Sequence, residues 1–281
     1  MDVNVQIQSN KVDVNQLPIY TGLIGGAPKV GKSTIASKWS DRGKDGVLLI
    51  DVDMGAYLIN CNRLPTPFLN PPVREVKTDK GTRKEVIPPI ERGYVYKAGK
   101  KKGQFMPVYS LYEVYSFIQD RLTSNDFSYD TVVIDTVDAL NHLVEQKVMQ
   151  ELGIGAMGST GYGQDWNRAK TKNLEILGRF INLLERNAVN TLLICHTKQR
   201  KITSDNTVQE SLALPSGLSK MLEGKMTWIC NVKRDKEGKP IADFKAYSEK
   251  QVGSRIKALN NTTIPFSYEN FKATIKNFKE D

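Results

Sequence analysis

The sequence is poor in cysteine and histidine and has no long apolar run. Its three cysteines, Cys61, Cys195 and Cys230, lie too far apart to show metal-ligand spacing, so we expect free thiols and a reducing, cytoplasmic setting. No stretch reaches the roughly 18–20 consecutive apolar residues that span a membrane. Residues 1–15 are polar and carry two aspartates, which is not typical of a signal or transit peptide. Disulfide scaffolds, zinc modules and membrane partners are therefore not expected.

Positive charge, in contrast, is in excess. The 40 lysines and arginines outnumber the 31 aspartates and glutamates, for a formal net charge of +9. Ten basic and four acidic residues fall within residues 74–102 alone. Such an excess favours polyanionic partners such as nucleic acid, although an ordinary basic protein fits the composition equally well.

Continuous apolar runs alternate along the chain with segments of helical spacing. The runs predict buried strands, and apolar residues at every third or fourth position predict amphipathic helices. Together they predict an α/β fold with a doubly wound, mainly parallel sheet and an antiparallel hairpin near the C-terminus. The predicted strands cover residues 19–24, 47–50, 131–134, 191–195, 227–232 and 242–247, and the predicted helices residues 33–40, 111–122, 137–152 and 174–184.

Composition divides the chain into one large domain and two tails. The core is expected to cover residues 19–265, between a tail of residues 1–18 and a weakly patterned tail of residues 266–281. Prolines and lysines mark residues 64–107 as a basic surface insertion, either irregular or hairpin-shaped. Glycine-rich or polar composition predicts two loops, at residues 153–163 and 198–217.

A phosphate-binding motif follows the first predicted strand. Residues 26–33, GAPKVGKS, fit the pattern G-x-x-x-x-G-K-[ST] without a mismatch, between an apolar strand and a helix. In this motif backbone N–H groups converge on phosphate oxygens, Lys32 reaches the β- and γ-phosphates, and the Ser33 hydroxyl ligates Mg²⁺. We therefore expect ATP and Mg²⁺ as cofactors. The predicted nucleotide contacts are Gly26, Ala27, Pro28, Lys29, Val30, Gly31, Lys32, Ser33 and Thr34.

Polar residues end three other predicted strands, at what should be the ligand-facing edge of the sheet. Asp135 is the expected partner of the Mg²⁺ hydration shell. Of Asp51 and Asp53, we favour Asp53 as the carboxylate that orients water on the γ-phosphate; the alternative is an acid that caps a turn. We expect His196 to donate a hydrogen bond to the γ-phosphate, unless it is a satisfied structural histidine.

These motifs, in this order, resemble the RecA/RadA ATPase core over roughly residues 20–265. RecA-like proteins have a catalytic Glu in Asp-x-Glu, so the resemblance implies that Asp53 of Asp51-Val-Asp53 replaces it with one methylene less. The phosphate sensor of several relatives is a histidine at the place of His196. Family members also carry basic residues that reach a neighbour's ATP. The resemblance therefore implies Arg255, in Gly-Ser-Arg-Ile, as a finger in trans and Lys250 as a weaker candidate.

The resemblance also implies two DNA-binding loops. Residues 151–158, ELGIGAMG, look like the first, and residues 198–217, with Lys198, Arg200 and Lys201, stand at the place of the second. A short core of this kind looks most like the phage RecA-like single-strand-annealing proteins. This resemblance implies a homo-oligomer that binds single-stranded DNA beside a single-strand-binding protein. It also implies a place in the phage or bacterial host cytoplasm.

Other functions share the motif. A small-molecule or nucleotide kinase needs an acceptor pocket with a mobile arginine-bearing lid, for which the sequence has no clear signature. A hexameric helicase motor shares the core, and a non-catalytic, ATP-gated DNA-binding scaffold is favoured if Asp53 cannot replace glutamate. A ParA-like partition ATPase fits less well, because its signature lysine would fall at Gly25 or Gly26.

Overall fold

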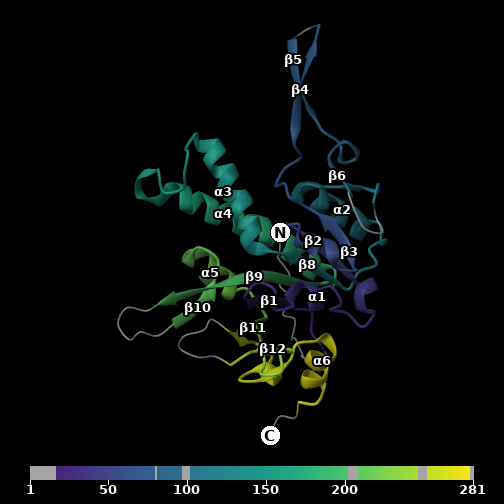
Figure 1. Ribbon diagram of the computed structural model, residues 1–281, viewed down its shortest axis with the longest axis vertical. Coiled ribbons are helices and arrows are strands. Elements are labelled where there is room, and N and C mark those ends of the chain that lie inside the picture. The colour runs from purple at the N-terminus through teal and green to yellow at the C-terminus, as the bar shows by residue number, and fades with distance from the viewer. Residues whose placement is uncertain (1–16, 80, 97–101, 202–207, 246–251, 279–281) are drawn as a thin grey trace, which may run out of the picture.

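The computed structural model describes residues 17–79, 81–96, 102–201, 208–245 and 252–278, and its centre is a ten-stranded sheet (Figure 1). The main path of the sheet runs β14-β12-β11-β1-β9-β8-β2-β3. The strands from β11 to β3 are all parallel, whereas β10, β12, β13 and β14 pair antiparallel. The predicted α/β fold with a mainly parallel sheet is therefore confirmed, including the β11–β12 hairpin.

The elements are as follows. The main sheet consists of β1 (Thr21–Gly26), β2 (Val47–Asp51), β3 (Asn62–Pro65), β8 (Thr131–Asp135), β9 (Asn190–Lys201), β10 (Val208–Leu212), β11 (Trp228–Arg234), β12 (Pro240–Asp243), β13 (Gly253–Ser254) and β14 (Thr263–Pro265). The α-helices are α1 (Lys32–Ala36), α2 (Leu111–Thr123), α3 (Val137–Leu152), α4 (Gln164–Arg186), α5 (Ser216–Glu223) and α6 (Tyr268–Lys276). Short 3₁₀ helices are η1 (Gly43–Gly46), η2 (Gly55–Leu58), η3 (Pro89–Glu91), η4 (Gly161–Gly163) and η5 (Lys257–Leu259). Among the residues described, no helix is long and apolar enough to cross a lipid bilayer.

Two apolar cores cover the two faces of the sheet. Neighbouring strand residues point to opposite faces, so Leu23 and Ile134 join one core while Ile24 and Val133 join the other. The first core is completed by apolar residues of α2, α3, α4 and α5, and the second by residues of α1 and α6. Burial on both faces explains why the parallel strands are apolar throughout.

The prediction of a C-terminal tail at residues 266–281 is wrong for Tyr268–Lys276, which form α6. Phe271 and Ile275, four positions apart, are fully buried. The Phe271 ring lies 5.3 Å, centroid to centroid, from the rings of both Trp39 and Trp228. This helix therefore belongs to the second core, and its short length concealed the helical spacing.

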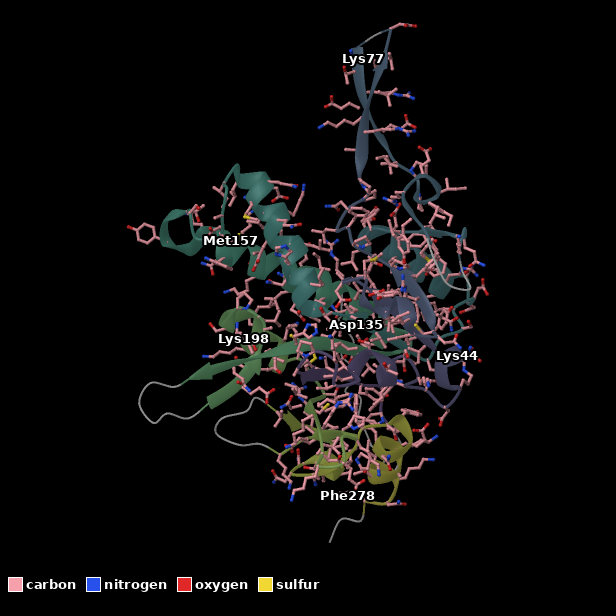
Figure 2. The ribbon with its side chains drawn as sticks, viewed as in Figure 1. Lys44, Lys77, Asp135, Met157, Lys198 and Phe278 are labelled. Carbon is pink, nitrogen blue, oxygen red and sulfur yellow. The ribbon has the colours of Figure 1, made fainter. Side chains whose placement is uncertain are left out.

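The basic insertion contains two small antiparallel sheets. Strands β4 (Val73–Thr78) and β5 (Gly81–Val86) form an exposed arm that projects from the body, with Lys77 near its far end (Figures 1 and 2). Strands β6 (Gly93–Val95) and β7 (Phe105–Pro107) pair closer to the main sheet. The insertion starts in β3, a parallel edge strand that the proline-rich sequence concealed.

The second predicted loop, residues 198–217, is wrong over most of its length. Strand β9 continues to Lys201, β10 returns antiparallel to it, and α5 begins at Ser216. Residues 202–207 lie outside the described part of the chain. The strand extension has the sequence Lys-Gln-Arg-Lys, which lacks the apolar alternation that predicts a strand.

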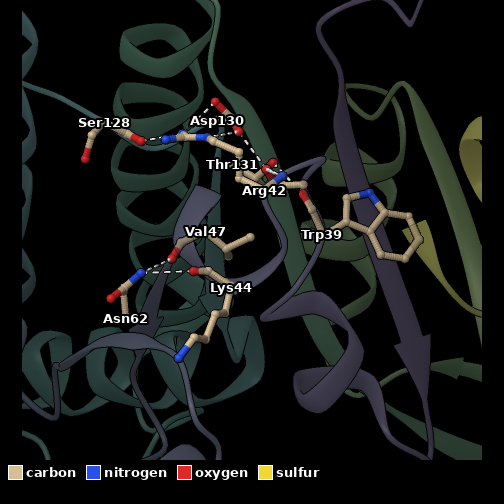
Figure 3. A network of polar contacts seen from close by, with 9 residues as sticks. Trp39, Arg42, Lys44, Val47, Asn62, Ser128, Asp130 and Thr131 are labelled. Carbon is tan, nitrogen blue, oxygen red and sulfur yellow. Dashed lines mark hydrogen bonds and ion pairs between the residues drawn. The ribbon is translucent and has the colours of Figure 1, made fainter. Parts of the chain in front are cut away.

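The turn after α1 is fixed to the neighbouring strands by a polar network (Figure 3). Arg42 places Nη2 2.8 Å from one carboxylate oxygen of Asp130 and Nε 3.0 Å from the other. The Thr131 hydroxyl donates to the backbone oxygen of Trp39 at 2.8 Å. The predicted helix 33–40 is shorter than expected, because the amides of Lys38 and Trp39 bond three residues back. These contacts hold α1, and hence the loop before it, against β8.

Candidate nucleotide site

The predicted phosphate-binding loop lies between β1 and α1. Lys29 and Gly31 have positive φ angles of 65° and 103°, the left-handed conformation found where successive backbone amides form an anion-binding nest. A Cβ on Gly26 would come within 2.5 Å of the Val232 carbonyl oxygen on β11, so only glycine fits there. Residues 27–29 are exposed. The loop therefore has both the backbone geometry and the access that a triphosphate needs.

Lys32 is buried inside the curve of this loop, with 5% of its surface exposed. Its ammonium group donates to the backbone oxygens of Gly26 and Ala27, at 2.8 Å each. Burial lowers its pKa, and the nearby carboxylates of Asp135 and Asp138 oppose that shift. An ammonium group held in this place can exchange the two carbonyl oxygens for phosphate oxygens, as the sequence predicts.

Strand order brings the predicted polar residues together. Strand β9 lies between β1 and β8, and its register pairs His196 with Gly26 and Ile194 with Asp135. Strand β2 in turn pairs Asp51 with Asp135. The carboxyl ends of four neighbouring parallel strands thus form one edge, with the histidine between the phosphate loop and the predicted metal-binding acid. Figure 2 shows Asp135 near the middle of the molecule.

Asp135 and Ser33 fit a magnesium site that phosphates complete. Asp135 is 2% exposed, and its Oδ1 has no hydrogen-bond partner among the described residues. Burial raises its pKa to about 6, against the effect of a hydrogen bond with Ser33. No group of three or more His, Cys, Asp or Glu in the described residues could hold a metal ion by itself. Mg²⁺ is commonly bound by one or two carboxylates plus water and substrate phosphates, which matches this donor set.

The two aspartates after β2 have different environments. Asp51 is fully buried; its Oδ2 lies 3.3 Å from the Arg63 guanidinium and accepts from the Ala56 amide at 3.3 Å. Asp53 is exposed, and its Oδ1 accepts from the Gly55 amide at 2.8 Å. The charge of Asp53 also affects the protonation of Asp135, Lys32 and His196, so it lies beside them. The geometry favours Asp53 over Asp51 as the group that faces a γ-phosphate.

Asp138, which holds His196, is not among the site residues that the sequence predicts. The Asp138 carboxylate accepts from the His196 backbone amide at 3.0 Å and lies 2.8 Å from its Nδ1. Asp138 and Asp135 are three residues apart across the start of α3. The signal in the sequence was a second acid just after the metal-binding strand, but its partner is set by the packing of α3 on β9.

Arg255 lies away from the nucleotide site of its own chain. Strand β13 pairs Ser254 with Trp228, at the amino end of β11, whereas the phosphate loop is at the opposite edge. The Arg255 guanidinium donates to the Gly224 carbonyl oxygen at 2.5 Å and is exposed. A contact with ATP is therefore open to it only in a neighbouring chain. Lys250 falls outside the described residues.

The predicted DNA-binding residues of the second segment follow His196 directly on β9. Lys198 is exposed (Figure 2). Its ammonium group donates to the Leu214 carbonyl oxygen at 3.0 Å. Arg200 and Lys201 pair through their backbones with Gln209 and Val208 of β10. The side chains of Arg200 and Lys201 fall outside what the structure describes.

The glycine-rich loop, residues 153–163, presents aromatic surface. Tyr162 in η4 is fully exposed, and Trp166 in the first turn of α4 is 41% exposed, so Trp166 is no core residue. The Gly158 amide donates to Asp165 at 2.5 Å, which ties the loop to the first turn of α4. Met157 marks the loop in Figure 2, on the same side of the molecule as Lys198.

Fold and site together define a P-loop nucleoside-triphosphate-binding protein of the α/β class. Residues 20–267 match the family AAA_24, described as an AAA domain. Because the match covers most of the chain, this protein belongs to that family of P-loop NTPase-like domains. None of the curated proteins compared with the chain matches it.

Proposed function

We propose that this protein is a RecA-type ATPase that hydrolyses Mg²⁺-ATP and binds single-stranded DNA, to promote annealing or recombination. The observation that carries the proposal is the course of β9. Between Asn190 and Lys201 this one strand runs beside β1, pairs His196 with Gly26 of the phosphate loop, and continues as the basic arm of the β9–β10 hairpin. A nucleotide-dependent movement of His196 would therefore act directly on Lys198, two residues away.

The surface chemistry of the two segments supports single-stranded DNA as the partner. Single-strand binding combines basic side chains that follow the phosphates with aromatic rings on which bases stack. Lys198, Arg200 and Lys201 supply the positive charge on one segment, and the exposed Tyr162 and Trp166 supply rings on the other. Because the sequence has no base-reading motif, we propose sequence-independent binding, with a single-strand-binding protein as a further partner.

The place of Arg255 supports a homo-oligomer as part of this proposal. This side chain is exposed and remote from its own phosphate loop, so it acts on ATP only across an interface. Size-exclusion chromatography with a non-hydrolysable ATP analogue and an oligonucleotide tests the assembly. We expect elution well ahead of the 31.5 kDa monomer. A strictly monomeric profile under these conditions would contradict a contact between Arg255 and the ATP of a neighbouring chain.

The decisive test is phosphate release from ATP with and without single-stranded DNA. We expect Mg²⁺-dependent hydrolysis that single-stranded DNA stimulates and that Lys32→Ala abolishes. If saturating DNA leaves the rate of ATP hydrolysis unchanged, hydrolysis is not coupled to DNA binding. Thin-layer analysis of labelled ATP identifies a kinase by transfer to an acceptor in place of phosphate release, and strand displacement identifies a helicase motor.

A second candidate function is ATP-gated DNA binding without turnover. It is favoured by one observation: Asp53 is a methylene shorter than glutamate, and its Oδ1 already accepts a hydrogen bond from Gly55. Oligonucleotide affinity measured with ATP and with a non-hydrolysable analogue distinguishes the two functions. An ATPase loses bound DNA over time only with ATP, whereas a gated scaffold retains it equally with both nucleotides.

A further inference from the structure

Asp138 lies in the first turn of α3, but its carboxylate does not cap that helix. The cap is Thr136, whose hydroxyl accepts from the Ala139 amide at 3.3 Å. The Asp138 carboxylate extends to β9 instead. One oxygen accepts from the His196 backbone amide at 3.0 Å, and the other lies 2.8 Å from His196 Nδ1. Two contacts from one carboxylate fix both the backbone and the ring of a single residue.

The charges around His196 favour its protonated form. Its hydrogen bond with Asp138 is the largest effect and raises the pKa of His196. Burial alone would raise the pKa of Asp138, but the hydrogen bonds from His196 outweigh it and the pKa is lowered. Lys32 on α1 opposes the positive charge, whereas Asp53 after β2 and Asp135 on β8 favour it. Burial of the ring acts against its charge, but the hydrogen bond with Asp138 outweighs it, so the geometry favours an imidazolium paired with a carboxylate.

We propose that Asp138 is a positioning residue for ATP hydrolysis: it occupies Nδ1 of His196, leaves Nε2–H as the donor for the γ-phosphate, and keeps the imidazole positively charged there. The inference rests on the proposed ATPase function and deepens it. A charged donor fixed before the reaction stabilises negative charge that develops on the transferring phosphoryl group. A carboxylate that orients a histidine from its other ring nitrogen acts in the same way in many metal sites.

Asp138→Asn is the informative substitution, because it keeps the shape and removes the charge. The His196 amide still requires an acceptor, so the carboxamide oxygen faces it and the NH₂ group faces Nδ1. Nδ1 must then be unprotonated, which leaves a neutral ring with its proton on Nε2. The donor to the phosphate survives, but its positive charge is lost.

Steady-state hydrolysis with saturating DNA tests this directly. A hydrogen bond contributes more free energy when its donor is charged than when it is neutral. Loss of this difference in the transition state predicts a fall in kcat of about tenfold for Asp138→Asn. KM for Mg²⁺-ATP should change little, because the phosphate loop is untouched. In a His196→Gln background Asp138→Asn should have no further effect. The matched control is Glu269→Gln, an exposed acid in the first turn of α6, which should keep the wild-type kcat.

A second readout does not need turnover. The chain has two histidines, so ¹⁵N-imidazole NMR gives two sets of signals, and His196→Gln assigns them. With a non-hydrolysable ATP analogue bound and the pH raised stepwise from about 6, near the ordinary histidine pKa, we expect the wild-type His196 ring to lose its proton at a higher pH than the ring in Asp138→Asn. The other histidine, His142, lies 3.0 Å from the Gln146 side chain and should not change.

Three results would overturn the inference. They are a wild-type kcat in Asp138→Asn, a further loss of kcat when Asp138→Asn is added to His196→Gln, or a His196 ring that loses its proton at the same pH in the wild type and in Asp138→Asn. Bound analogue and an unchanged thermal midpoint establish that each variant is folded. If the wild type fails to hydrolyse ATP, the proposed function fails, while the NMR result still decides whether Asp138 keeps His196 charged.

Discussion

Asp51 and Asp53 are two positions apart, yet their surroundings assign them different tasks. Asp51 is buried against Arg63, an ion pair whose loss on one side leaves an uncompensated charge in the interior. Asp53 is exposed at the edge where Lys32 and Asp135 meet. We therefore expect substitution of Asp51 to affect folding and substitution of Asp53 to affect the chemistry.

Asp53→Asn should keep Mg²⁺-ATP affinity within about threefold and reduce turnover by about 100-fold or more, since an amide cannot orient or activate the attacking water as a carboxylate does. Calorimetry measures the affinity, and phosphate release measures the turnover. Asp45→Asn, an exposed acid of η1, is the control and should retain full turnover. Unchanged turnover in Asp53→Asn would transfer the role to another group.

The pKa of Asp135 predicts how nucleotide binding responds to pH. Because burial raises that pKa to about 6, the carboxyl group is ionised above this pH and becomes neutral below it. The Mg²⁺-dependent part of the ATP affinity should therefore fall as the pH falls through about 6. The nucleotide phosphates titrate in a similar range, so Asp135→Asn is the reference. An identical pH dependence in wild type and variant would contradict the role of Asp135.

The sequence predicts the residues whose function depends on a local motif, and misses those whose partners are distant. Lys32, Ser33 and Asp135 follow from the phosphate loop and a strand end. Asp138 and Arg63 could not be predicted, because their partners His196 and Asp51 are brought to them only by the packing of α3 on β9 and the pairing of β3 with β2.

At the scale of elements, the apolar strands and long helices could be predicted and the polar ones could not. Helix α3 has the predicted limits, residues 137–152, because apolar spacing and a glycine stop define it. The outer part of β9 pairs with β10 through the backbone, and Leu212 at the end of β10 joins the first core, so this segment shows little apolar pattern in its sequence. Helix α6 has two fully buried residues in nine, which are too few to show helical periodicity in the sequence.

Neutralising Lys198, Arg200 and Lys201 with glutamine should weaken oligonucleotide binding and flatten its salt dependence. Each phosphate contact on a single strand contributes about 0.7 to the slope of log K against log salt, so three lost contacts reduce the slope by about 2. Fluorescence anisotropy over a salt series measures it. The triple control Lys236→Gln, Lys239→Gln and Lys276→Gln removes equal charge elsewhere. Equal slopes for the two triple variants would contradict the proposal that the β9–β10 hairpin contacts DNA.

Phe271→Ala tests whether α6 is part of the fold. The ring is fully buried against Trp39 and Trp228, so its removal should lower the free energy of unfolding by about 3–5 kcal/mol. Phe105→Ala on β7 removes a ring that is 43% exposed and should cost below about 1 kcal/mol. Chemical denaturation compares them. Equal losses for the two variants would contradict the place of α6 in the core.

At the scale of the whole molecule, one sheet edge and one strand connect the parts. The two cores hold the sheet rigid, and the loops at its carboxyl edge carry the nucleotide site. Strand β9 extends from that edge toward the side of the molecule that carries residues 153–163, while the β4–β5 arm projects elsewhere (Figures 1 and 2). Composition predicted the basic character of the arm and left open whether it is irregular or a hairpin, because an exposed hairpin buries nothing that would pattern its sequence.

The central claim is that residues 26–33 bind the triphosphate of a nucleotide together with Mg²⁺. Isothermal titration calorimetry with purified protein tests it most directly. We predict one ATP site for each chain, an affinity that falls when EDTA removes Mg²⁺, and no measurable binding in Lys32→Ala, because the ammonium group on the β- and γ-phosphates is lost. Unchanged thermal unfolding of Lys32→Ala shows that the variant is folded. Absence of Mg²⁺-dependent affinity of the wild type for any nucleoside triphosphate would contradict the account.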